Sequence, residues 1–326
     1  MACRFTRKTL RFSIVKYWVG ITDKQWFTYL AALAPEEVNF WRPSSTQNFG
    51  AIEVGAPFLF KLHSPDNFIV GGGFFVRHTT LPLSLAWETF ERNNGTDNLF
   101  ELHRRISHFS RKTDPDPVIG CTVLTEPFFF QRADWIPVPA SWSPNIVVGK
   151  TYDTEMLEGA ALWRAVNDRL SAVRNPIGKS ADEMIAITKE DRPLYGNDCI
   201  IRPRLGQGGF RVVVTDAYNR RCAMSGERTL PVLQASHIKP YALNGPHNIT
   251  NGLLLRSDLH ILYDRGYVAV TPDYQILVSK RIKEEFSNGR EYYALNGRPL
   301  VSMPSAVPNR PSRDYLEWHC HNVFKS

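Results

Sequence analysis

The chain has 326 residues, of which 43% are hydrophobic, and this length suggests two domains that each bury a core. Its formal net charge of +7 favours polyanionic partners, because lysine and arginine gain affinity when they neutralise phosphates. The five cysteines form no CxxC pair, so neither a disulfide framework nor a cysteine zinc site is indicated. No apolar run has membrane-spanning length and no cleavable signal is present, so we expect a cytoplasmic protein without a membrane partner.

The first half of the chain mixes strand-like runs with amphipathic helices. The basic opening through Trp18 is interpreted as an arm leading into a strand, with a transit peptide as the alternative. A capping residue at 22 or 23 begins a helix whose apolar positions share one face: Trp26, Phe27, Leu30 and Leu33. The runs PFLFKL and FIVGGGFFVRH flank the turn signal Ser64–Asn67 and predict a hairpin. Gly71–Gly73 indicate a bulge or a tight barrel corner, because no helix follows them as a phosphate loop would require.

Further helices are expected over residues 81–95, 97–112 and 153–173, with a strand at 118–130. Charge, proline and glycine then interrupt the pattern. The predicted organisation is therefore a first domain at residues 1–174, a linker at 175–205 and a second domain at 206–326.

Three segments of the first domain, VNFWRP, GAPFLFKL and FIVGGGFF, resemble the strand pattern of the PUA-like superfamily, which includes EVE, ASCH and YTH-type readers. The resemblance implies a small β-barrel with flanking helices and an aromatic pocket in which a modified or flipped base stacks. The candidate pocket residues are Trp18, Trp41, Phe75 and Trp87. Aromatic residues at alternating positions are also ordinary core residues, so packing is the alternative.

The stretch QASHIKPYALNGPHNITNGLLLRSDLHILYD, residues 234–264, contains His237, Asn251 and His260. Phosphodiester hydrolysis needs a base that takes a proton from water and a cation that stabilises charge on the phosphoryl and leaving oxygens. A neutral imidazole titrates close to working pH and can be that base. A pair of hydrogen-bonded core histidines is the alternative interpretation.

The order of YNRRCAMSG, ASHIKP and NGLLLRSDLHILYDRGYVAV, between residue 211 and about residue 282, resembles the HNH nuclease family. The resemblance implies an α+β chain whose second domain is a ββα-metal nuclease. By the match, His237 is the general base, Asn251 ties the loop together through side-chain to backbone hydrogen bonds, and His260 is a metal ligand on the helix. Asp258 and Asp264 are close enough in sequence to support the metal directly or through water.

One departure from the family concerns the metal. Many members have Asp immediately before the base, where this chain has Ser236, and a hydroxyl is a poorer Mg²⁺ ligand than a carboxylate. Ser236 is therefore a candidate ligand of a looser site, or Asp258 or Asp264 compensates. The family implies one Mg²⁺, with Mn²⁺ or Ni²⁺ as alternatives because imidazole suits softer cations. No structural zinc is expected, since Ser225 stands at the CxxC spacing from Cys222.

Two other histidine groups are interpreted without a catalytic role. His247 lies in the loop NGPHNIT and is expected to be exposed. The terminal run His319–His321 is expected to belong to an amphipathic closing helix rather than to a metal site.

These features favour a restriction-type endonuclease that cuts double-stranded DNA, depends on a base modification and serves phage defence. The chain as a whole also resembles bacterial HNH restriction endonucleases. One HNH site cuts one strand, so double-strand cleavage implies a homodimer or two binding events. Five basic residues are candidates for DNA contacts, with a solvated face as the alternative: Arg211, Arg220, Arg221, Lys239 and Arg256. Two alternative functions are a catalytically degenerate binder of nucleic acid or nucleotide, which Ser236 supports, and an HNH effector nuclease gated by a small nucleotide.

Overall fold

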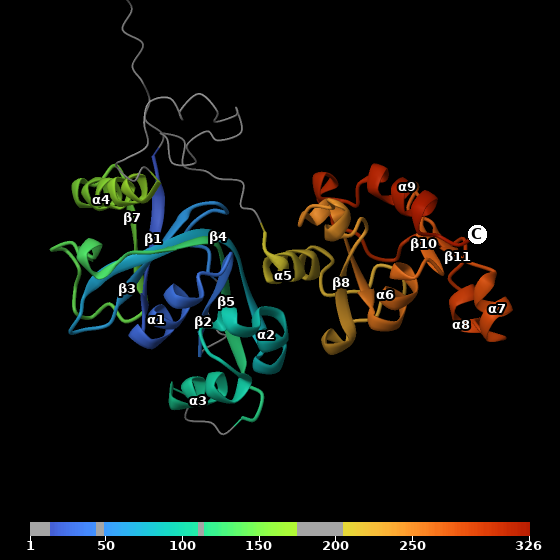
Figure 1. Cartoon of the computed structure of the whole chain (residues 1–326), viewed down its shortest axis with the longest axis horizontal. Helices are drawn as coiled ribbons and strands as arrows, with labels where there is room; N and C mark the ends of the chain where they lie inside the picture. Colours follow the sequence, from blue (N-terminus) through green and yellow to red (C-terminus); the bar gives the residue numbers. More distant parts are fainter. Residues whose placement is uncertain (1–13, 44–48, 110–113, 175–204) are drawn as a thin grey trace, which may run out of the picture. The chain divides into compact units, whose positions relative to one another are not determined.

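The computed structural model describes residues 14–43, 49–109, 114–174 and 205–326 (Figure 1). Contacts divide the chain into two compact units. The first comprises Met1–Val38, Asn48–Val76 and Leu124–Pro203, and the second comprises Asn39–Gln47, Arg77–Val123 and Arg204–Ser326. Residues 1–13 of the basic opening and nearly all of the predicted linker lie outside the described residues.

A seven-stranded sheet contains the N-terminal strands in the order β2-β5-β4-β3-β1-β7, with β6 paired to β4. Its strands are β1 (Lys16–Thr22), β2 (Glu37–Arg42), β3 (Pro57–Leu62), β4 (Phe68–Pro82), β5 (Val118–Phe129), β6 (Ile136–Pro137) and β7 (Gly149–Asp153). The predicted hairpin is present, since β3 pairs antiparallel with β4 and the register shifts beside the glycine triplet, between Phe60 and Lys61. Gly71 is required there, because a Cβ atom would lie 2.2 Å from the Phe128 carbonyl oxygen.

The α+β class is confirmed, but the predicted barrel is not closed. Among the strands that the structure describes, no pairing joins the two ends of the order, β2 and β7, so the sheet is open. Alternating apolar residues indicate which face of a strand is buried, but closure depends on strand tilt and stagger, which that pattern does not specify.

Four helices accompany this sheet: α1 (Lys24–Leu33), α2 (Leu83–Phe90), α3 (Leu99–Phe109) and α4 (Leu157–Arg174). In α1, the Asp23 side chain accepts a hydrogen bond from the Trp26 N–H at 2.7 Å, which caps the helix as the sequence predicts. The indole of Trp26 then packs against Phe60 in the core, with ring centroids 5.2 Å apart.

The C-terminal part of the chain contains a ββα arrangement. Strand β8 (Leu233–His237) pairs antiparallel with β9 (Gly252–Arg256), and α6 (Ser257–Asp264) follows β9 directly. Helix α5 (Gln207–Ala217) and α6 both pack against β8 (Figure 1). The remaining elements are β10 (Val268–Val270), β11 (Ile276–Val278), α7 (Arg281–Phe286), α8 (Arg290–Tyr293) and α9 (Arg313–Asn322).

One hydrophobic core supports this arrangement. The apolar run Leu253–Leu255 on β9 is fully buried, as are Phe210 of α5 and Leu316 of α9. Burying side chains of this size contributes about 1.5–3 kcal/mol each to folding. The active-site candidates therefore lie on elements that a shared core holds together. None of the helices in the described ranges has the length and apolar character needed to cross a membrane.

Candidate active site

The ββα arrangement brings the three predicted catalytic residues to adjoining positions. His237 ends β8, and the β8–β9 register places it opposite Gly252, next to Asn251. His260 lies on α6, which begins one residue after β9 ends. His237, His260 and Asp264 line a single cavity of about 530 Å³.

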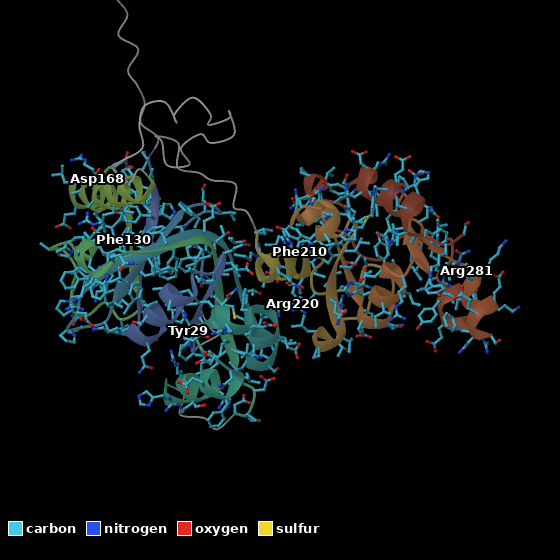
Figure 2. The ribbon with its side chains drawn as sticks, in the orientation of Figure 1. Tyr29, Phe130, Asp168, Phe210, Arg220 and Arg281 are labelled. Atoms are coloured by element: carbon cyan, nitrogen blue, oxygen red, sulfur yellow. The ribbon has the colours of Figure 1, made fainter. Side chains whose placement is uncertain are left out.

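The surroundings of His237 favour a neutral imidazole. Its ring stacks on Phe210 of α5, with centroids 3.9 Å apart and planes 11° apart (Phe210 is labelled in Figure 2). Its Nε2 atom lies 3.0 Å from Nδ1 of His247. Burial, and then the nearby His247, lower the pKa of His237 to about 4, so its imidazole is uncharged at neutral pH and can accept a proton.

Asn251 holds the loop that follows His237 through hydrogen bonds. Its side chain is fully buried, and its Oδ1 atom accepts a hydrogen bond from the Lys239 N–H at 2.9 Å. Its Nδ2 group donates to the carbonyl oxygens of Lys239 at 2.9 Å and Pro246 at 3.0 Å. Because these partners lie near the two ends of the loop, one side chain fixes the path between His237 and His247.

His260 and Asp264 form a pair with the character of a cation site. Nδ1 of His260 lies 2.7 Å from the Gln234 amide oxygen, which can only accept, so Nδ1 carries the proton. Nε2 lies 3.2 Å from Oδ2 of Asp264. A neutral His260 would then turn a lone pair toward a carboxylate oxygen, and this contact needs a second proton or a shared cation. The donor set therefore fits a divalent metal.

The other two predicted metal ligands are engaged elsewhere. Both carboxylate oxygens of Asp258 accept from the Arg256 guanidinium, at 2.7 and 2.8 Å, and Tyr292 donates to one of them at 3.2 Å. The Arg256 hydrogen bond accordingly lowers the pKa of Asp258. Ser236 is fully buried, and its hydroxyl donates to the His237 carbonyl at 3.4 Å. In the part of the chain that the structure describes, no three His, Cys, Asp or Glu residues gather as a metal-binding group.

Of the five basic residues predicted to contact DNA, Arg211 lines the cavity. Arg256 is paired with Asp258, and the ammonium of Lys239 lies 5.6 Å from the centre of the Trp318 ring. Arg220, labelled in Figure 2, lies 3.7 Å from Asp216, and Arg221 donates to the Gly226 carbonyl at 3.3 Å.

The sequence interpretation missed four contributors to the site. His247, predicted to be exposed, is half-buried against His237, and the ring of Phe210 stacks on that of His237. Gln234 orients His260, and its place three residues before His237 on the same strand is the one signal available for it. His319 of the closing helix also lines the cavity, is stacked on Tyr263 at 3.8 Å, and has a buried Nδ1 atom without a partner.

The four predicted base-pocket residues are divided between the two units. In the first unit, Phe49 contacts both Trp18 and Phe75, with ring centroids 5.3 Å apart in each case. The buried Nε1 atom of Trp18 has no hydrogen-bond partner. Trp41 and Trp87 belong to the second unit, where Trp41 donates to the Asn94 carbonyl at 2.9 Å. Two of the four predicted residues are thus brought together, around a phenylalanine that the sequence interpretation did not single out.

Comparison with known protein families identifies one segment of the chain. A family model described as HNH endonuclease matches residues 222–271. A search of curated proteins gives no match. The solved structures found include ASCH from Zymomonas mobilis, at 10% identity and a TM-score of 0.31, over 45% of this chain and 92% of that chain. A mutant of the same protein matches at 9% identity and a TM-score of 0.32, over 46% of this chain and 97% of that chain.

A modification-dependent restriction endonuclease, TagI, matches at 12% identity and a TM-score of 0.25, over 87% of this chain and 74% of that chain. TM-scores this low decide neither fold nor function for the present chain, so the assignment depends on the family match. That match spans His237, Asn251, His260 and Asp264. The chain therefore carries an HNH endonuclease domain, and residues 222–271 belong to that family.

Proposed function

We propose that this protein is a metal-dependent DNA endonuclease of the restriction type, in which His237 is the general base. The observation that carries the proposal is the shared cavity within the HNH segment, where an uncharged imidazole and the His260–Asp264 pair face the same space. The formal charge of +7 and the position of Arg211 on the cavity wall support a nucleic-acid substrate.

In the proposed reaction, His237 takes a proton from a water molecule, whose oxygen then attacks phosphorus. A new phosphorus–oxygen bond forms, and the bond from phosphorus to the leaving sugar oxygen breaks with its electron pair going to that oxygen, which takes a proton from solvent to become a hydroxyl. Phe210 keeps the His237 ring in one plane, and Asn251 holds the loop that follows it. The imidazole of His237 is thus already positioned before the reaction begins, which lowers the entropic part of the barrier.

His260 and Asp264 are the residues that would hold the cation, in place of Ser236 and Asp258, whose side chains are already bonded. When bound there, a divalent cation would neutralise negative charge on the phosphoryl and leaving oxygens. Two protein ligands leave room for water and a substrate phosphate, as Mg²⁺ prefers. The imidazole ligand makes Mn²⁺ and Ni²⁺ suitable as well.

Recognition of a modified base is proposed for the aromatic cluster of Trp18, Phe49 and Phe75. Aromatic rings bind extruded bases through their faces. Here the Phe49 ring lies edge-on to Trp18, at 89°, and is tilted by 58° from Phe75, and the unpartnered Nε1–H of Trp18 offers a donor beside them. Cleavage of both strands would follow from a homodimer or from two successive binding events.

Matched DNA substrates test this function. We expect Mg²⁺- or Mn²⁺-dependent cutting, with one modified DNA preferred about tenfold or more, because base stacking contributes about 1–3 kcal/mol. The set comprises cytosine, 5-methylcytosine, 5-hydroxymethylcytosine, glucosylated cytosine, N6-methyladenine and phosphorothioate DNA. Trp18→Ala should remove the preference and leave the basal rate. Equal cutting of all substrates would exclude a modified-base reader, and no cutting of any would exclude the nuclease.

The pH profile gives a second prediction. Because burial lowers the pKa of His237 to about 4, the neutral base persists as the pH falls below 6.5, the ordinary value for histidine. We expect the acid limb of kcat/KM to have its midpoint well below pH 6.5, measured by initial rates of plasmid nicking at constant ionic strength. A midpoint at or above 6.5 would mean that His237 is not held in this environment during the reaction.

A catalytically inactive binder of nucleic acid is the second candidate. The replacement of the usual Asp by Ser236, and the lack of a third metal-binding side chain within the described ranges, favour it. Such a protein would shift DNA in a gel without nicking it in the presence of any divalent cation.

A further inference from the structure

The imidazole of His247 contacts the imidazole of His237, and the proposed reaction gives His247 no role. Its Nδ1 atom lies 3.0 Å from Nε2 of His237, with the two rings 64° apart. The ring of Tyr241 stacks on the His247 ring, with centroids 4.4 Å apart and planes 19° apart. Each histidine is thus flanked by its own aromatic ring, Phe210 for one and Tyr241 for the other. This packing restricts the rotation that would break the contact.

The chain also holds His247 through its backbone. Asn251 donates to the carbonyl oxygen of Pro246, the residue immediately before His247. Gly245 comes so close to the start of the loop that a Cβ atom would lie 1.9 Å from the Lys239 carbonyl oxygen. A close approach of this kind excludes other residues at 245 and fixes where the loop returns toward the base.

The hydrogen bond between the two rings determines which nitrogen of His237 is able to accept a proton from water. A neutral imidazole carries one proton, and a ring nitrogen that already bears it cannot accept another. Nε2 of His237 is occupied by His247, so Nδ1 is the atom left to meet water. Nδ1 can accept a proton only if Nε2 carries the existing one and donates it to Nδ1 of His247. The opposite arrangement would block the base.

We propose that His247 is a positioning residue, which accepts a hydrogen bond from the Nε2–H of His237 and so keeps Nδ1 of the base unprotonated and directed at water. This role deepens the proposed nuclease function and depends on His237 being its base. After proton transfer both nitrogens of His237 bear hydrogen, and His247 still accepts from Nε2. The pair thus resembles the base and orienting acceptor of other hydrolytic sites, with a neutral acceptor.

Two substitutions at this position separate positioning from packing. In His247→Asn the side-chain oxygen stands close to where Nδ1 was and can still accept, whereas His247→Ala has no acceptor. We expect His247→Ala to lower kcat about 10- to 100-fold with little change in KM, as for other residues that orient a catalytic group, and His247→Asn to keep most of the rate. His321→Ala removes an exposed histidine from the closing helix and serves as the matched control with wild-type activity.

The outcomes are separable from failure of the nuclease proposal. If the wild type cuts DNA and His247→Ala cuts equally well, or if Asn is as damaging as Ala in folded protein, the positioning role is wrong and the nuclease remains. If the wild type does not cut at all, the nuclease proposal itself is wrong.

A measurement that does not depend on activity shows directly which ring nitrogen of His237 carries the proton. In ¹⁵N-labelled wild-type protein, two-bond proton–nitrogen spectra of the histidine rings distinguish a protonated nitrogen from a bare one. At neutral pH we expect His237 to be protonated at Nε2 and bare at Nδ1, and His247→Ala to shift that balance. A wild-type His237 protonated at Nδ1 would overturn the inference, even if the variants were too unstable to assay.

Discussion

Substituting His237 with alanine is expected to slow DNA cleavage by about 10²- to 10⁴-fold, the range typical of removing a general base. Binding of DNA should persist, because cationic side chains, not the neutral imidazole, provide most of the attraction to phosphates. The measurement is single-turnover nicking of a supercoiled plasmid with Mg²⁺ or Mn²⁺, with a gel shift in Ca²⁺ for binding.

A rescue experiment makes this result specific. Alanine leaves the face of Phe210 uncovered in a cavity of about 530 Å³, so free imidazole can stack where the side chain was. Added imidazole should restore part of the lost rate in His237→Ala and have no such effect on the wild type. Retention of more than about a tenth of the wild-type rate without imidazole would show that another group is the base.

Asn251→Ala is expected to lower the free energy of unfolding by about 3 kcal/mol, because each buried polar group left without a partner costs about 1–3 kcal/mol. The groups affected are the Lys239 N–H and the carbonyl oxygens of Lys239 and Pro246. The same change frees the loop between His237 and His247, so cleavage should fall even at temperatures where the variant is folded. Urea denaturation gives the first effect, and nicking assays give the second.

Two further variants serve as comparisons for Asn251→Ala. Asn251→Asp keeps the acceptor for the Lys239 N–H but turns a carboxylate toward two carbonyl oxygens, so we expect it to be at least as destabilising as alanine. Asn145→Ala changes an exposed asparagine and should alter stability by less than about 0.5 kcal/mol. If Asn251→Ala unfolds at the wild-type urea concentration, the loop does not depend on this side chain.

The central part of the site could be predicted from the sequence because it is local. The residues from Leu233 to Asp264 form two paired strands joined by a loop, and a helix that follows the second strand directly, so the spacing of His237, Asn251 and His260 fixes their neighbourhood. Helix α1 was predictable for a similar reason, since its cap and apolar face lie within a dozen residues.

The remaining parts depend on contacts between distant segments. Phe210 and His319 reach the cavity from helices outside the ββα arrangement, and no spacing rule connects them to His237. His247 was expected to be exposed because a Gly–Pro loop normally is, but the Asn251 hydrogen bonds turn this loop back onto the base. Likewise, the parallel pairing of β1 with β3 and the open edges of the sheet follow from tertiary packing.

The Phe210 stacking has a consequence for how the nuclease part could be excised. The family match begins at residue 222, yet the ring beneath the base comes from α5, and Leu316 of α9 completes the same core. A fragment trimmed to residues 222–271 would expose the Leu253–Leu255 run and leave His237 without its platform. A fragment that keeps this core therefore has to extend at least from α5 through α9, more than twice the length that motif matching alone delimits.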